Sequence, residues 1–188
     1  MAERFKVVYY VNQFFGQIGG EDKADMKPEV HEDKIGPALG FDALIKDQGD
    51  VVATIICGDN YFNENKADAL EKVMEAIKKY NPDVLVTGPA FNAGRYGMAC
   101  AEIGKAVFEQ MNIPVVTGMY PENPGVDVCK QQAIIVETSD SAAAMRKALP
   151  VMANIVKKIV SGVELGAPAA EGYIPQGAHK TVLVDKRG

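Results

Sequence analysis

Residues 51–87 read VVATIICGDNYFNENKADALEKVMEAIKKYNPDVLVT, and this stretch decides the predicted fold. Residues 51–57 form a β-branched, almost wholly apolar run that stops at Gly58. From Lys66 to Tyr80 the apolar residues recur every three or four positions, which is typical of an amphipathic helix. Pro82 ends that helix, because proline disfavours helical geometry in the residue before it. Residues 83–87 are again apolar, so the stretch predicts two buried strands joined by a right-handed helical crossover.

The same alternation continues on both sides of this unit. Apolar runs at residues 5–11, 113–117 and 133–137 predict further strands, and helical spacing occurs at residues 93–111 and 141–161. Pro150 is expected to kink or split the last helix, and residues 37–45 are compatible with a short helix. We therefore predict an α/β fold with a doubly wound, mainly parallel sheet of about five strands, in the three-layer flavodoxin- or Rossmann-like arrangement.

The length of 188 residues predicts a single domain. We assign residues 1–164 to the α/β domain, with an irregular insertion around residues 16–49. Residues 165–188 are rich in proline and glycine over most of their length and show no helical or strand period. They are interpreted as a C-terminal arm that leads toward another domain or a partner subunit.

Composition excludes several classes of function. With 20 basic and 25 acidic residues the net charge is −5, and no basic cluster supplies a surface for nucleic acid. No apolar run is long enough to cross a bilayer, and no signal peptide begins the sequence, so we expect a cytoplasmic protein. Three cysteines and two histidines provide neither a disulfide framework nor a zinc-binding spacing.

Polar residues follow the predicted strands, and ligands of open parallel sheets bind at the carboxyl ends of the strands. Arg95 stands in the first turn of a predicted helix, where it and the free backbone N–H groups would form a site for a carboxylate or phosphate. The alternative is an ion pair between Arg95 and a local carboxylate such as Glu122. The predicted binding residues are Asn12, Gln13, Asn60, Asn92, Arg95, Tyr96, Tyr120 and Asn123.

Three residues are candidates for catalysis: Cys57, Asp59 and Glu122. Cys57 ends a strand and is either a reactive thiol or a small buried apolar residue. Asp59 and Glu122 are candidate acid–base or amine-binding groups. Residues 16–20 (GQIGG) lack the spacing of a dinucleotide fingerprint, no Gly-Lys-Ser/Thr phosphate loop occurs, and no nucleophile–histidine–acid triad is indicated.

Several long strings of the sequence resemble the selenoprotein subunit of protein B of the glycine/sarcosine/betaine reductases. The likeness runs through nearly the whole chain in the same order. The strings are NQFFGQIGGEDKAD (residues 12–25), ICGDNYF (56–62), GPAFNAGRYG (88–97), TGMYPENPGVD (117–127) and EGYIP (171–175).

The resemblance implies a subunit of an oxidoreductase that takes part in anaerobic amino-acid reduction. In that family a pyruvoyl group on a partner subunit activates the amine, and a carboxymethyl group passes to the selenocysteine of protein A. The family's subunit is longer, and its downstream half carries selenocysteine, which this chain lacks. We therefore expect the N-terminal part of such a subunit or a short relative, inactive alone and without a cofactor of its own. Self-association is left open.

The resemblance and the residue pattern lead to one hypothesis about the ligand. Glycine, sarcosine and betaine each carry a carboxylate beside a nitrogen, which Arg95 and the surrounding backbone would bind. Asp59 or Glu122 would lie near the nitrogen, with Tyr96 or Tyr120 beside it; betaine would favour an aromatic cage. The sequence does not decide among the three substrates. The alternatives are a non-catalytic domain that docks the pyruvoyl-containing subunit and, less favoured, a flavodoxin-like electron carrier.

Overall fold

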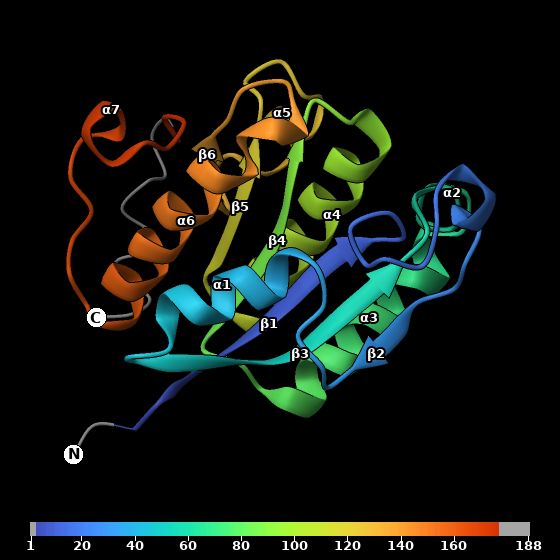
Figure 1. Ribbon diagram of the computed structural model, residues 1–188, viewed down its shortest axis with the longest axis horizontal. Helices are drawn as coiled ribbons and strands as arrows, with labels where there is room; N and C mark the ends of the chain where they lie inside the picture. The colour runs from blue at the N-terminus through green and yellow to red at the C-terminus, as the bar shows by residue number, and fades with distance from the viewer. Residues whose placement is uncertain (1–2, 177–188) are drawn as a thin grey trace.

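A twisted six-stranded sheet organises the protein, whose computed structural model describes residues 3–176 (Figure 1). The strand order is β2-β3-β1-β4-β5-β6, and only β2 runs antiparallel to its neighbour. The strands are β1 (Phe5–Asn12), β2 (Glu29–His31), β3 (Gly49–Cys57), β4 (Val84–Phe91), β5 (Val115–Met119) and β6 (Ile134–Glu137).

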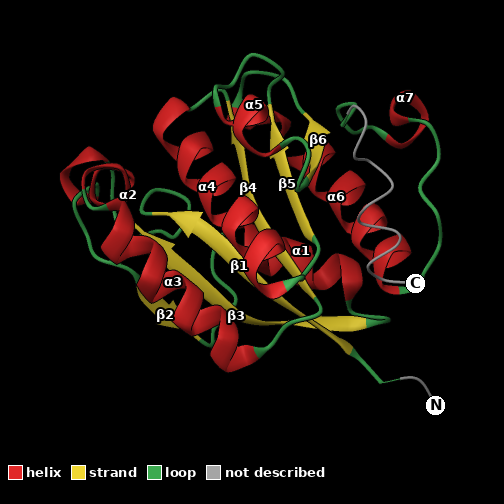
Figure 2. Cartoon of the chain, turned by 180° about the vertical axis from the view of Figure 1, so that it is seen from behind, coloured by secondary structure: helices red, strands yellow, loops and turns green. Residues whose placement is uncertain are grey.

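Helices cover both faces of the sheet. One face packs against α1 (Pro37–Ile45) and α6 (Met145–Val160), which lie in front of the sheet in Figure 1. The other packs against α3 (Lys66–Tyr80) and α4 (Gly94–Met111), seen in front in Figure 2, with α5 (Gly125–Cys129) against α4. The shorter helices are α2 (Asp59–Glu64), α7 (Pro168–Glu171), η1 (Glu21–Lys23) and η2 (Ala142–Ala144).

The parallel strands are mostly apolar because both faces of the sheet are covered. Every residue of β4 and β5 is buried, and in β1 only Lys6 is exposed. Such strands lack the in–out alternation of a sheet that is solvated on one side. The continuous apolar runs in the sequence are therefore explained by the three-layer packing.

The order of the parallel strands identifies the edge at which a ligand would bind. If β2 is left out, the order across the sheet is β3-β1-β4-β5-β6. Numbered along the chain, these parallel strands are the second, first, third, fourth and fifth, which is the flavodoxin-like arrangement. The chain winds outward from β1 in one direction and from β4 in the other. A ligand-binding crevice is therefore expected at the carboxyl ends of β1 and β4, where the direction reverses.

The predicted fold class is confirmed, and two details differ from the expectation. The region 16–49 contributes a sixth strand, β2, which is short and largely exposed and so has no apolar run to mark it. Pro150 does not split α6, which continues from Met145 to Val160. Proline inside a helix removes one backbone hydrogen bond, and this loss is tolerated because the apolar face of α6 is buried on both sides of Pro150.

The described part of the C-terminal arm returns to the sheet. Tyr173 forms an isolated antiparallel bridge with Val136, and the backbone N–H of Ile174 donates to the carbonyl of Ile135 at 2.7 Å. The rest of the predicted arm, residues 177–188, lies outside the described residues. Within residues 3–176 no helix is both long enough and apolar enough to span a bilayer.

Candidate functional site

A cavity of about 360 Å³ opens at the carboxyl ends of β1 and β3, beside the start of α4. This is the edge at which the strand order reverses. Its lining includes Asn12, Gln13, Asp59, Arg95 and Tyr96, all of which were predicted site residues. The register of β1 and β3, which pairs Asn12 with Cys57, places Asn12 and Gln13 next to the turn that carries Asp59.

Asp59 is the most unusual group in this cavity, because its carboxylate is almost fully buried. The side-chain amide of Asn12 donates to Oδ2 of Asp59 at 2.9 Å, and the backbone N–H of Asp59 donates to Oε1 of Gln13 at 3.0 Å. The second oxygen, Oδ1, is buried and has no hydrogen-bond partner among residues 3–176. Burial raises the pKa of Asp59 to about 6, against the lowering effects of Asn12 and Arg95.

Arg95 supplies the positive charge at the mouth of the cavity. Its Nη2 donates to Oε1 of Glu21 at 2.6 Å, and its Nη1 donates to Oδ1 of Asn60. The side chains of Arg95 and Glu21 are 47% and 71% exposed, so water and small ligands reach this ion pair. The carboxylate partner that the sequence analysis left open is therefore Glu21 from η1, and not Glu122.

Aromatic side chains form one wall of the cavity. The ring of Phe15 stacks on that of Tyr96 with a centroid distance of 5.8 Å and an interplanar angle of 29°. The ring of Phe14 meets Phe15 edge-on at 5.1 Å. Tyr96 is fully buried, and this burial raises the pKa of its phenol well above the usual range.

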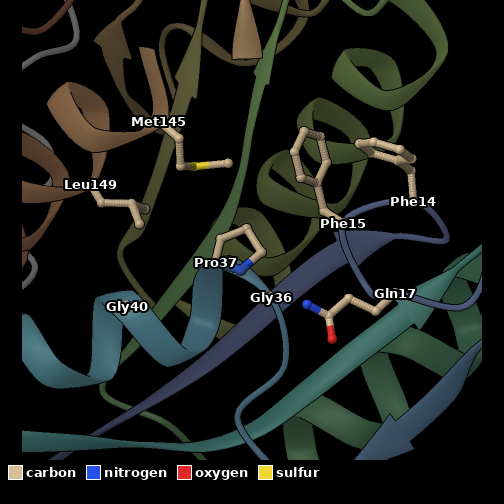
Figure 3. A pocket seen from close by; sticks show the side chains of 8 residues that line it. All are labelled: Phe14, Phe15, Gln17, Gly36, Pro37, Gly40, Met145 and Leu149. Atoms are coloured by element: carbon tan, nitrogen blue, oxygen red, sulfur yellow. The ribbon is translucent and has the colours of Figure 1, made fainter. Parts of the chain in front are cut away.

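A second, apolar cavity of about 390 Å³ lies on the other side of this wall (Figure 3). Phe14 and Phe15 line both cavities. In Figure 3, Met145 and Leu149 of α6 lie opposite these rings, with Pro37 of α1 below. Phe14, which lines this second cavity, and Leu39, which precedes the lining residue Gly40 in α1, are each 61% exposed.

Several predicted site residues lie outside the polar cavity. Asn123 is buried, donates from Nδ2 to the carbonyls of Phe91 and Ala93, and accepts from the backbone N–H of Gly125. It therefore fastens the loop after β4 to the loop after β5. Asn92 and Glu122 are exposed in turns, and Tyr120 is half-buried. Asn60 does not line the cavity but accepts a hydrogen bond from Arg95.

Cys57 faces the interior and does not line the cavity. It is fully buried at the end of β3, and burial raises the pKa of its thiol to about 12. A reactive cysteine requires the opposite shift, because the thiolate is the nucleophile. The structure favours the buried apolar role that the sequence analysis kept as the alternative.

Three residues that shape the cavity were not among the predicted site residues: Phe14, Phe15 and Glu21. Phe14 and Phe15 follow the polar pair at the end of β1, and Glu21 lies in the insertion. Only their location after the first strand could have marked them as site residues, because in a doubly wound sheet this segment borders the ligand-binding crevice.

The matches to known proteins all indicate the same family. The family model described as "Glycine/sarcosine/betaine reductase selenoprotein B" matches residues 4–188. The glycine reductase complex component B subunit gamma of Carboxydothermus hydrogenoformans is 50% identical over 185 residues, which cover 98% of this chain and 42% of that protein. The sarcosine reductase complex component B subunit beta of Peptoclostridium acidaminophilum is 47% identical over 186 residues, or 99% and 43% of the two chains.

The betaine reductase complex component B subunit beta of Peptoclostridium acidaminophilum is 42% identical over 172 residues, 92% of this chain and 39% of that protein. The chain thus spans less than half the length of these three relatives. No solved structure matches it.

Proposed function

The chain belongs to the glycine/sarcosine/betaine reductase selenoprotein B family, and from this premise we propose that it forms part of the substrate pocket of such a reductase complex. The ligand is a small zwitterion, glycine or an N-methylated glycine, destined for reductive deamination. One observation carries the proposal. A buried carboxylate with an unpartnered oxygen, Asp59, shares a cavity with the accessible guanidinium of Arg95.

The two charged groups match the two ends of such a ligand. A guanidinium binds a carboxylate through parallel N–H donors, and a buried carboxylate oxygen accepts hydrogen bonds from an ammonium group. Leaving a buried charged oxygen without a donor is costly, on the order of 1–3 kcal/mol or more. A ligand nitrogen that donates to Oδ1 of Asp59 would remove this cost, which supports a binding role over a purely structural one.

We propose that the redox chemistry depends on groups supplied from elsewhere. Cys57, Cys100 and Cys129 are all buried, and burial raises the pKa of each thiol. None of them offers an activated thiolate. The pyruvoyl group would come from a partner subunit, and selenocysteine from protein A and from the part of the family's longer subunit outside this chain. On this proposal the chain binds and orients the substrate and is inactive alone.

The Arg95→Ala variant tests the binding of the carboxylate. We expect it to lower the affinity for glycine at least about tenfold, because charge-assisted hydrogen bonds contribute roughly 1.5–3 kcal/mol. Isothermal titration calorimetry with the whole chain measures this directly. Arg4→Ala is the matched control: its side chain is 46% exposed and is also paired with a carboxylate, Asp50. Equal glycine affinity in the two variants would remove Arg95 from the site.

A substitution at Glu21 provides a second test, in which glycine binding is expected to become tighter instead of weaker. Its carboxylate already occupies Nη2 of Arg95, so a ligand carboxylate must displace it. The Glu21→Gln substitution removes the competing charge, and we expect glycine to bind roughly threefold to tenfold more tightly, a change of about 1 kcal/mol typical of an exposed ion pair. Weaker binding in the same titration would instead show that Glu21 supports the ligand.

Docking of a partner subunit is the second candidate function, favoured by the exposed apolar rim of the second cavity. Phe14, which lines this cavity, and Leu39, next in sequence to the lining residue Gly40, are large exposed apolar side chains, and such surfaces mark sites of protein contact. The proposed partner is the pyruvoyl-containing subunit of the complex.

The Leu39→Ser variant tests this docking. We expect it to weaken association with the pyruvoyl-containing subunit about tenfold, as for a central apolar contact of an interface. Val163→Ser, which changes a 50% exposed valine beyond the end of α6, serves as the control. Surface plasmon resonance with the purified partner would show equal affinities for the two variants if the rim of the second cavity were not the docking surface.

A further inference from the structure

The two carboxylate oxygens of Asp59 differ in their hydrogen bonding. Oδ2 receives the Nδ2 donor of Asn12, whose own Oδ1 accepts from the backbone N–H of Phe15 at 2.9 Å. The Asn12 side chain is thereby fixed in one orientation. Oδ1 of Asp59 has no donor within the described part of the chain, although Asp59 is only 6% exposed and lines the cavity.

A buried, ionised oxygen of this kind requires an N–H or O–H donor. Burial raises the pKa of Asp59 to about 6, so near pH 7.5 the carboxylate is mainly ionised and only accepts hydrogen bonds. A donor from the ligand satisfies it. A methyl group in the same place would exclude water and leave the oxygen buried without any partner.

The rings of the aromatic wall pack against one another and are not arranged around an open centre that would hold a quaternary nitrogen. Such a cation is bound by open ring faces that surround it. Here Phe15 and Tyr96 stack against each other, and Phe14 meets Phe15 at an interplanar angle of 82°. The faces of Phe15 and Tyr96 that meet in the stack are used within the wall itself.

Building on the proposed function, we infer that Asp59 makes the cavity selective for amino acids whose nitrogen carries at least one hydrogen. The unpartnered Oδ1 of Asp59 is the specificity-determining atom. Glycine and its mono-methylated form meet this requirement, whereas the fully methylated betaine has no N–H to donate.

A methylation series separates this inference from a simple effect of size. Glycine, N-methylglycine and N,N-dimethylglycine all keep an N–H in their zwitterionic forms, and only N,N,N-trimethylglycine has none. We expect calorimetry at pH 7.5 to give affinities that differ little across the first three ligands. Affinity should then fall about tenfold or more at the last step, the consequence of an unsatisfied buried acceptor. A size effect predicts an even decline along the series.

The Asp59→Asn variant is the decisive companion, because it presents no unpartnered carboxylate oxygen to the ligand. We expect it to bind all four ligands weakly and to lose the drop between the third and the fourth. Asp127→Asn, at an 88% exposed aspartate on α5, is the charge-matched control and should keep the drop. Circular dichroism verifies that both variants are folded.

The outcomes that contradict the inference differ from those that contradict the proposed function. An even decline, betaine binding as tightly as glycine, or a drop that persists in Asp59→Asn would overturn the role of Asp59 while leaving a zwitterion site in place. Failure of all four ligands to bind the wild-type chain would overturn the proposed function and this inference with it.

Discussion

The Asp59→Asn variant is expected to be more stable than the wild-type chain at pH 7, although on the proposed function it should bind glycine poorly. The pKa of Asp59 rises from 3.8 to about 6 on folding, so burying the ionised form costs about 3 kcal/mol at neutral pH. The neutral amide still accepts from Asn12 but leaves an N–H group without a partner, at a cost of about 1–2 kcal/mol. We expect a net gain of about 1–2 kcal/mol, or roughly 2–8 °C in melting temperature.

The stability of the wild-type chain should change with pH in a direction that follows from the raised pKa of Asp59. The folded chain holds a proton on Asp59 more tightly than the unfolded chain does, so this group stabilises the fold fully below pH 3.8. That contribution is lost as the pH rises through about 6. Near pH 4 the wild type no longer bears the cost of ionisation, so the variant should be roughly 1 kcal/mol less stable than the wild type, whereas above pH 7 it should be more stable by about 1–2 kcal/mol. Urea unfolding of both proteins between pH 4 and pH 8 measures this difference.

Other acidic groups act in the opposite direction but cancel in this comparison. Hydrogen bonds from basic side chains lower the pKa values of Asp47, Asp50 and Glu171. Their contributions to stability are lost as the pH falls, equally in both proteins. A variant that is less stable than the wild type at pH 7 would show that the Asp59 carboxylate stabilises the fold, and the argument for a binding role would lose its physical basis.

The Gly58→Ala substitution is expected to cause a large loss of stability. The backbone of Gly58 is in an ordinary extended conformation, so the difficulty is one of space. An added Cβ would lie 2.2 Å from the carbonyl oxygen of Ala24 and 2.7 Å from the backbone nitrogen of Met26. Backbone cannot move aside as a flexible side chain can. We expect a loss of about 3 kcal/mol, which lowers the melting temperature by roughly 6–12 °C.

The damage at Gly58 should extend to the polar cavity that we propose binds the ligand. The carbonyl of Ala24 accepts hydrogen bonds from the backbone N–H groups of Asn60 and Tyr61, and the N–H of Gly58 donates to the carbonyl of Met26. These bonds hold the segment that follows η1 against the turn that carries Asp59. Pushing the two apart would displace Glu21 from Arg95. We therefore expect Gly58→Ala to change glycine binding as well as thermal unfolding.

Gly40→Ala is the matched control for this prediction. Gly40 lies within α1, and its added Cβ would meet only the Leu149 side chain, at an ordinary distance of 3.4 Å. Alanine favours a helix by up to about 1 kcal/mol relative to glycine. The control should therefore be as stable as the wild type or slightly more stable. Equal melting temperatures for Gly58→Ala and Gly40→Ala would contradict the close packing at Gly58.

Much of the site was predictable because parallel strands share an edge. Asn12, Gln13 and Asp59 directly follow strands that the apolar runs had located, so their meeting required only the strand order of a doubly wound sheet. Arg95 was identified from its place in the first turn of a helix. The partner of Arg95 was not predictable, because Glu21 lies 74 positions away in a segment without hydrophobic period.

The sequence by itself determined most of the helices and strands and their packing in three layers. Continuous apolar runs and helical spacing are local patterns, which can be recognised within each element separately. The sequence also located the edge of the sheet where polar groups gather. Only the tertiary structure decided which of these groups face one another. The side chain of Asn123 donates hydrogen bonds to backbone carbonyls, and Cys57 is buried in the core. One carboxylate oxygen of Asp59 has no hydrogen-bond partner among the described residues. Burial and hydrogen bonding depend on contacts between distant segments, and no local pattern of residues records those contacts.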